Sequence, residues 1–186
     1  MDFKNGAELL DLCSQYSCSI SQIMRRRECE LGETTQDVLQ AKMERILSIM
    51  KESATSPIKS PRKSIGGLIG GEARLLNEHR TAGKAICGNV ISRAITYACA
   101  VLEVNTSMGL IVAAPTAGSS GIVPGVILAL QEEYRISDDR LMDALFNAGA
   151  IGYLAMRNAT VAGAVGGCQA EVGVAAAMAA SATVEL

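Results

Sequence analysis

An uncharged run limits most strongly how this chain can fold. Residues 104–131 contain no Asp, Glu, Lys or Arg. An unbroken membrane span needs about 20 predominantly apolar residues, but Pro115, Pro124 and the polar stretch 116–121 interrupt the run. We therefore expect two buried segments that meet at a loop inside the protein. A chain of 186 residues, 49% of them hydrophobic, can bury a core of that kind.

The remaining segments show the periodicity of helices. One amphipathic helix is expected over 8–27, with Gly32 as its end, and Thr34 is expected to start the next helix. Later helices are expected over 84–104, after the loop at 116–121, from a Ser137 cap to about Arg157, and from Cys168 onward. The sequence thus predicts an all-α fold, a compact helical domain in which Gly-rich loops lead into buried Gly/Ala-rich helices. Within the last helix, Gly173, Ala177 and Ser181 are expected to allow a close backbone approach.

Composition suggests three parts along the chain. Residues 1–52 form an N-terminal helical segment, and residues 65–186 form a helical core of catalytic type. Between them, residues 53–64 hold two prolines and four serines, which is the composition of a linker.

The loop between the two apolar segments has the composition of an anion site. Hydroxyls and backbone N–H groups of residues 116–121 could surround a carboxylate or a phosphate at the start of a helix. Pro124 fits the first turn of that helix. The stretch lacks the Gly-Lys-Ser/Thr ending of a Walker A motif, which argues against a nucleotide. An ordinary turn between helices is the alternative.

A second candidate is Cys168, which follows Gly166 and Gly167. Glycines of this kind can take a positive φ that ends one helix and begins another. A thiol at a helix N-terminus is favoured as thiolate, the form that acts as nucleophile or metal ligand. The alternative is a small buried cysteine on a close-packed helix.

The other five cysteines do not suggest a cluster or a disulfide framework. Helical rise places Cys18 and Cys29 roughly 16 Å apart, and Cys87 and Cys99 roughly 18 Å apart. The spacings that include Cys13 match no zinc module, and no secretory signal is evident. All five are interpreted as reduced structural thiols, which predicts a reducing, cytoplasmic compartment.

Charge gives no indication of nucleic acid binding. The formal net charge is −2 and aromatic residues make up 3% of the chain, so neither a basic footprint nor stacking platforms are expected. The basic clusters at 25–27 and 59–63 are interpreted as solvated helix surface and linker. We expect neither a nucleic acid nor a membrane as partner.

Three motifs together resemble one family. Residues 97–125 read YACAVLEVNTSMGLIVAAPTAGSSGIVPG, and this stretch resembles the alpha chain of the iron–sulfur L-serine dehydratase (L-serine ammonia-lyase) family. Residues 163–173, GAVGGCQAEVG, are similar to that family's first cluster-cysteine motif. Residues 66–73, GGLIGGEA, resemble its upstream Gly-rich stretch. The resemblance is clearest from about Gly66 to the end.

The resemblance implies conversion of L-serine to pyruvate and ammonia by a [4Fe-4S] cluster that three cysteine thiolates hold, with one iron open to the substrate as a Lewis acid. It assigns Cys168 as one ligand. It assigns the contacts to the substrate carboxylate to Thr116, Ala117, Gly118, Ser119, Ser120, Gly121 and, less directly, Asn105. A base must remove the α-proton; His79, Lys84 and Glu103 are the candidates in this chain. In the family the site is shared with a beta domain, which in many bacteria is a separate beta chain that could supply the base.

Two departures qualify the resemblance. The chain ends at Leu186, before the family's other cluster cysteines, so we expect a C-terminal truncation and an inactive isolated chain. Val165 stands where relatives often carry an acidic residue. The alternative function is a non-enzymatic helical fragment that binds a beta chain without a cluster. Apolar surface exposed by a truncation would favour self-association, so a homo-oligomer stays open.

Overall fold

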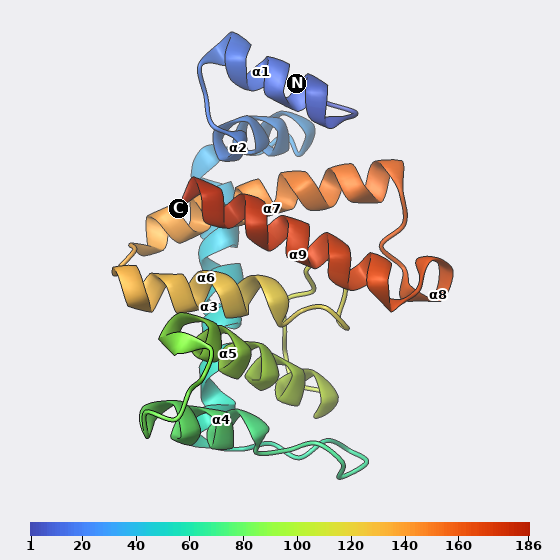
Figure 1. The fold of residues 1–186 in the computed structure, drawn as a ribbon. Coiled ribbons are helices and arrows are strands. Elements are labelled where there is room, and N and C mark those ends of the chain that lie inside the picture. Colours follow the sequence, from blue (N-terminus) through green and yellow to red (C-terminus); the bar gives the residue numbers. More distant parts are fainter. The chain divides into compact units, whose positions relative to one another are not determined.

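The computed structural model describes residues 1–186 as nine helices with no strand, which confirms the all-α prediction (Figure 1). The helices are α1 (Gly6–Tyr16), α2 (Ile20–Leu31), α3 (Gln36–Lys59), α4 (Glu72–Thr81), α5 (Gly88–Thr106), α6 (Ile122–Tyr134), α7 (Asp138–Asn158), α8 (Gly163–Gly166) and α9 (Cys168–Glu185). None of them combines the length and the apolar character that a membrane crossing requires.

The chain divides into two compact units. Unit 1 contains residues 1–47 and 137–186, and unit 2 contains the continuous segment 48–136. This division differs from the expected boundaries at 52 and 64 because the N-terminal helices share a hydrophobic core with α7. Phe3, Leu9 and Ile23 from the first half of unit 1 pack with Phe146 and Ala150 from the second half.

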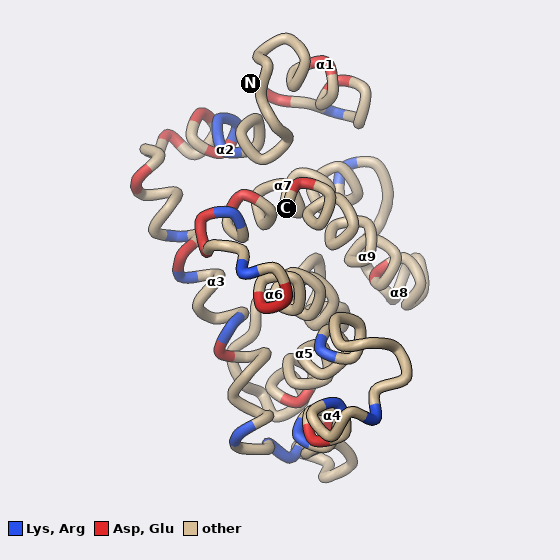
Figure 2. The backbone as a smooth tube through the Cα atoms, turned by 60° about the vertical axis from the view of Figure 1, so that its left-hand side comes forward, with Lys and Arg blue, Asp and Glu red and all other residues tan.

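In unit 1, α9 lies along α7 (Figure 1). The side of α9 that is buried carries Ala175, Met178, Ala179 and Ala182. The expected close approach was therefore wrong for Gly173 and Ala177, which are exposed, whereas Ser181 is half-buried and donates to Asn147 Oδ1 of α7 at 2.6 Å. Figure 2 shows α9 almost free of charged positions, whereas α2, α3 and α4 carry many.

The expected helix over 8–27 is two helices. Ser17 takes a left-handed conformation, φ 49°, and ends α1. Ser19 then starts α2 with a capping box, in which its side chain accepts from the backbone N–H of Gln22 and the Gln22 side chain accepts from the backbone N–H of Ser19. The apolar periodicity continues across the break, so periodicity alone gave no sign of it.

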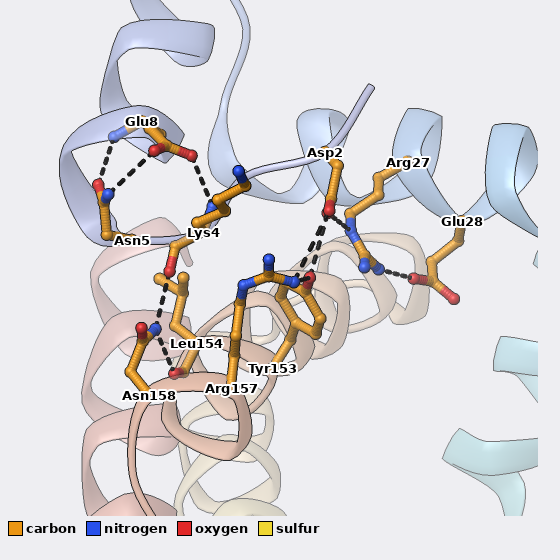
Figure 3. Close-up of polar contacts among 10 residues, drawn as sticks. All are labelled: Asp2, Lys4, Asn5, Glu8, Arg27, Glu28, Tyr153, Leu154, Arg157 and Asn158. Atoms are coloured by element: carbon orange, nitrogen blue, oxygen red, sulfur yellow. Dashed lines mark hydrogen bonds and ion pairs between the residues drawn. The ribbon is translucent and has the colours of Figure 1, made fainter.

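A polar cluster fastens the N-terminus to α2 and α7 (Figure 3). The Asp2 carboxylate accepts from Arg27 Nε at 2.7 Å and from the Tyr153 hydroxyl at 3.2 Å. The hydrogen bond from Arg27 lowers the pKa of Asp2 below its usual range. The Arg27 guanidinium also lies 3.8 Å from the centroid of the Tyr153 ring. Asn158 Nδ2 donates to the Lys4 carbonyl at 2.8 Å, which holds the chain just before α1.

In unit 2, residues 53–59 continue α3, although a linker was expected there. Pro57 lies inside the helix and has no N–H to donate. Its ring is nevertheless fully buried, and Met50 and Ala54 are buried as well. Burial of this apolar face compensates for the lost backbone hydrogen bond.

Two other boundaries agree with the sequence, and a third differs. Gly32 follows α2 as its C-cap, and the Ser137 side chain caps α7 by accepting from the backbone N–H of Arg140. The helix expected from about 84 begins at Gly88, and a separate helix, α4, precedes it.

Candidate functional site

Two glycines place the loop that precedes α6. A Cβ atom on Gly121 would lie 2.6 Å from the carbonyl oxygen of Ala98, and one on Gly125 would lie 2.8 Å from that of Ala94. Only glycine allows α6 to approach the backbone of α5 so closely. The residues 116–121 therefore lead into a helix whose first turn is fixed against α5.

The hydroxyls of this loop act mainly on the loop itself. Ser120 Oγ donates to the Ala117 carbonyl at 2.8 Å, and Ser119 Oγ lies 3.2 Å from Thr116 Oγ1. Ser119 and Ser120 are buried, whereas Ala117 and Gly118 are exposed. A ligand that approached this loop would therefore meet the backbone at 117–118 before the two serine hydroxyls.

Asn105 is brought to the same loop. It lies in the last turn of α5, and its Nδ2 donates to the Ala117 carbonyl at 3.0 Å. The structure thus brings together Asn105 and the loop residues that the sequence had grouped. Asn105 fixes the orientation of the exposed peptide at 117–118.

Glu103 faces in another direction. Its side chain is 1% exposed, and Oε1 accepts from the backbone N–H of Ala73 at 2.8 Å. Ala73 lies in the first turn of α4, whose N-cap, Gly71, has no side chain to offer. The Glu103 carboxylate therefore caps α4 from outside the helix and interacts with its positive end. Since Asn105 is two residues further along α5, the two side chains project from nearly opposite sides of the helix.

The other two candidate bases lie at the far end of α4. His79 is exposed in the last turn, and Lys84 is exposed in the turn that follows. The backbone N–H of Lys84 donates to the His79 carbonyl at 3.2 Å, which closes that turn. Neither residue belongs to the hydrogen-bonded group formed by Asn105 and the loop.

Cys168 lies in unit 1, at the start of a helix, as the sequence predicted. It is the first residue of α9, and Gly167 before it has φ 77°. A Cβ on Gly166 would lie 2.8 Å from both Ala170 Cβ and Thr160 Cγ2, so this second glycine is needed for close packing. The thiol is free and exposed, which contradicts the alternative of a buried cysteine.

Cys168 is the one cluster ligand that the sequence predicts in this chain. Nowhere do residues 1–186 bring together three or more His, Cys, Asp or Glu side chains in a way that could hold a metal ion. Cys168 fits a single ligand position, being an exposed thiol at the positive end of an 18-residue helix. The chain by itself therefore does not form a complete cluster site.

The cap on α4 is the contact that sequence reasoning missed. A sign of it was present, because Glu103 is the only charged residue between Arg93 and Glu132 and lies within an apolar helix. A lone carboxylate in such a helix needs a partner. Its partner is a backbone N–H, which no residue pattern marks.

The comparisons with known proteins agree on one family. The family model described as "Serine dehydratase alpha chain" matches residues 15–186. The chain is 39% identical over 184 residues to a probable L-serine dehydratase, alpha chain, of Bacillus subtilis (strain 168), covering 99% of this chain and 61% of the relative. It is 37% identical over 179 residues to the L-serine dehydratase, alpha chain, of Peptoniphilus asaccharolyticus, covering 96% and 61%. It is 36% identical over 187 residues to an L-serine dehydratase of Helicobacter pylori (strain ATCC 700392 / 26695), covering 96% and 40%.

The chain thus spans about three fifths of the length of the two alpha-chain relatives. The family match nevertheless includes the loop before α6, the Glu103 cap and Cys168, so both units contain family sequence. Because the match extends from residue 15 to residue 186, the chain belongs to the serine dehydratase alpha chain family.

Proposed function

We propose that this chain is the alpha-chain part of an L-serine dehydratase, which converts L-serine to pyruvate and ammonia. The observation that carries the proposal is the family match over residues 15–186. The names of the relatives from Bacillus subtilis and Peptoniphilus asaccharolyticus support it. The term alpha chain in those names supports a separate beta chain as partner.

The loop before α6 is the proposed contact for the substrate carboxylate. The proposed residues are Thr116, Ala117, Gly118, Ser119, Ser120, Gly121 and Asn105. Their arrangement supports this role because the buried hydroxyls and Asn105 fix the loop, which leaves the peptide at 117–118 exposed near the start of a 13-residue helix. A helix start and fixed backbone dipoles favour an anion without reorganisation.

Cys168 is the proposed ligand of a [4Fe-4S] cluster. When bound, such a cluster supplies a Lewis acid that makes a hydroxyl a better leaving group. The role of this chain is to hold one thiolate at the start of α9, where the helix dipole favours the charged form. The further ligands are proposed to lie outside this chain. Six free cysteines fit a reducing compartment, and we propose the cytoplasm.

The base is proposed to come from the beta chain. Within this chain, the Glu103 carboxylate already binds the first turn of α4, and His79 and Lys84 lie at the opposite end of that helix. None of the three belongs to the hydrogen-bonded group at the loop.

Anaerobic reconstitution with iron and sulfide, with and without the candidate beta chain, tests the proposal. We expect visible charge-transfer absorbance and release of pyruvate from L-serine when both chains are present. Cys168→Ser should abolish both signals. Cys87→Ser is the matched control, since Cys87 is also an exposed cysteine at the start of a long helix, and this variant should keep both signals.

Two results would overturn parts of the proposal. If the absorbance survives in Cys168→Ser but is lost in Cys87→Ser, the ligand assignment is wrong. If the two chains bind each other and no cluster forms under any condition, the second candidate function holds, that of a helical fragment that binds a beta chain without a cluster. The absence of three clustered ligands in this chain is what keeps that candidate in the test.

A further inference from the structure

We propose that Cys13 and Cys18 are a redox-active pair of thiols, which a low-molecular-weight disulfide converts into an internal disulfide. In an unbroken helix, residues five positions apart project about 140° from each other, so the two thiols would point in different directions. The break at Ser17 changes this, because its left-handed conformation, φ 49°, turns the chain back over the end of α1.

The turn at Ser17 has the hydrogen bonds of a Schellman motif. The backbone N–H of Ser17 donates to the Ser14 carbonyl at 3.3 Å, and that of Cys18 donates to the Cys13 carbonyl at 3.0 Å. In this motif the side chains of the two residues that the longer of these loops joins frequently contact each other. In this chain both of those residues are cysteines.

The hydrogen bond limits how far apart the two cysteines lie. With standard bond lengths, an N···O distance of 3.0 Å keeps the Cα atoms of Cys13 and Cys18 within about 7 Å of each other. Disulfides usually join residues whose Cα atoms are about 4.4–6.8 Å apart. The bond can therefore form without a large movement of the backbone.

The environment of the two thiols agrees with this geometry. Cys18 Sγ donates to the Tyr16 carbonyl at 3.2 Å, so this thiol turns back toward the end of α1. Burial raises the pKa of the Cys13 thiol, and the Glu185 carboxylate and the Cys18 thiol raise it further, as neighbouring groups do. Both cysteines pack against the hydrophobic core of unit 1 and are half-buried, which leaves part of each side chain accessible to a small reagent.

The oxidation balances as two thiol–disulfide exchanges. The thiolate of one cysteine attacks oxidised glutathione, forms a mixed disulfide and releases one glutathione thiolate. The thiolate of the other cysteine attacks the protein sulfur of that mixed disulfide, forms the bond between Cys13 and Cys18 and releases the second glutathione thiolate. The two released thiolates take up the two protons that the cysteines lose. The pair loses two electrons, and oxidised glutathione gains them.

The disulfide would fix the corner between α1 and α2. Glu185, at the end of α9, reaches the same corner, where its carboxylate accepts from the backbone N–H of Ser21 at 3.4 Å. The inference goes beyond the proposed function and does not depend on it, because neither Cys13 nor Cys18 is a proposed cluster ligand.

The experiment incubates the reduced full chain with mixtures of oxidised and reduced glutathione, then quenches it with acid, alkylates the remaining thiols and digests it with trypsin. Cys13 and Cys18 lie in one tryptic peptide, residues 5–25. This peptide should become lighter by two hydrogen atoms and should carry neither glutathione nor an alkyl group. Dithiothreitol should reverse the change.

Cys99 is the internal control. It is also half-buried, burial also raises the pKa of its thiol, and it is the only cysteine within α5. It should stay reduced or stop at the mixed disulfide. At a fixed concentration of reduced glutathione, half-oxidation of the 5–25 peptide should need about tenfold less oxidised glutathione in the folded chain than in concentrated urea, because the turn holds the thiols together.

Variants separate the pair from its surroundings. Cys18→Ser removes one of the two thiols, so its peptide should carry one glutathione on Cys13 or none. Cys29→Ser, at a half-buried cysteine that packs against the same core, should leave the half-oxidation point unchanged. Ser17→Gly keeps the left-handed turn and Ser17→Val disfavours it, so the valine variant should need several-fold more oxidised glutathione than the glycine variant.

Three results would overturn the proposal. The first is a 5–25 peptide that takes up glutathione but forms no internal disulfide at any ratio of the two glutathione forms. The second is the same half-oxidation point in the folded chain and in urea. The third is a disulfide from Cys13 or Cys18 to a third cysteine in place of the internal one.

Discussion

Gly121→Ala tests whether the loop before α6 depends on close helix packing. The new Cβ would lie 2.6 Å from the Ala98 carbonyl oxygen and 3.1 Å from its Cα. That is about 0.8 Å short of the 3.4 Å at which ordinary van der Waals contact begins. Both contacts are with backbone atoms, so no flexible side chain can move aside. The start of α6 must shift away from α5.

The expected cost follows from two effects. Overpacking of a close contact costs about 1–3 kcal/mol. Gly121 is also the N-cap of α6, a position where alanine is worse than glycine, so no gain in helix propensity offsets the clash. We expect a loss of about 2–3 kcal/mol in the free energy of unfolding. Gly125→Ala lies inside α6, where a propensity gain of about 1 kcal/mol offsets part of the clash, so its loss should be smaller.

Urea denaturation followed by far-UV circular dichroism measures these changes. Gly173→Ala is the matched control, because Gly173 is an exposed helical glycine whose Cβ would contact nothing within 4 Å. It should gain about 0.5–1 kcal/mol. Amide exchange read by mass spectrometry should increase in α5 and α6 of Gly121→Ala and should not change in Gly173→Ala. If Gly121→Ala unfolds at the same urea concentration as the unchanged chain, with unchanged exchange, the packing argument is refuted.

Three further outcomes are expected. Glu103→Ala should destabilise the chain in urea by about 2 kcal/mol because a helix cap is lost, and Glu103→Gln, which keeps an acceptor oxygen, should cost at least about 1 kcal/mol less. Equal costs of the two variants would contradict the capping role. Burial, and then the hydrogen bond to the Glu132 carboxylate, raise the pKa of the Tyr97 hydroxyl above the ordinary 10.0. The protonated hydroxyl therefore stabilises the fold below pH 10, and this stabilisation is lost as the pH rises above 10. Tyr97→Phe should flatten that alkaline loss in urea titrations, and an unchanged slope would argue against the assignment. Asn147 is 3% exposed and its Nδ2 donates to the Glu185 carboxylate at 2.6 Å, so Asn147→Ala should lower the free energy of unfolding in urea by about 2 kcal/mol. Asn158→Ala, at an exposed position, should lower it by less than about 1 kcal/mol, and similar losses would contradict a buried polar bridge at Asn147.

Sequence reasoning succeeded where a local signal decides the structure. Ser137 as a cap, Gly32 as a helix end and the loop between two apolar segments all depend on residues within a few positions. It failed where distant contacts decide. Pro57 is accommodated in α3 because its ring is buried. The left-handed Ser17 divides a stretch whose apolar periodicity is continuous.

The candidate site shows the same division. The family resemblance grouped Asn105 with the loop, and the hydrogen bond to Ala117 joins them. The exposure of Cys168 could not be read from the sequence, because a Gly/Ala-rich helix is compatible with a buried or an exposed first residue. The role of Glu103 depended on a helix, α4, that the sequence did not reveal.

Unit 1 is built from two separate stretches of the chain, and this has a consequence for the order of folding. Phe3, Leu9 and Ile23 pack with Phe146 and Ala150, which follow the whole of unit 2 in the chain. During synthesis the N-terminal helices emerge first, and until α7 has been made they can pack only on each other and on the start of α3, which supplies Leu39 to this core. Unit 2 is continuous and can complete its own core in the meantime. The newborn chain therefore exposes the side of its first helices that packs on Phe146 and Ala150 until α7 is synthesised, and this is the interval in which a chaperone would bind it.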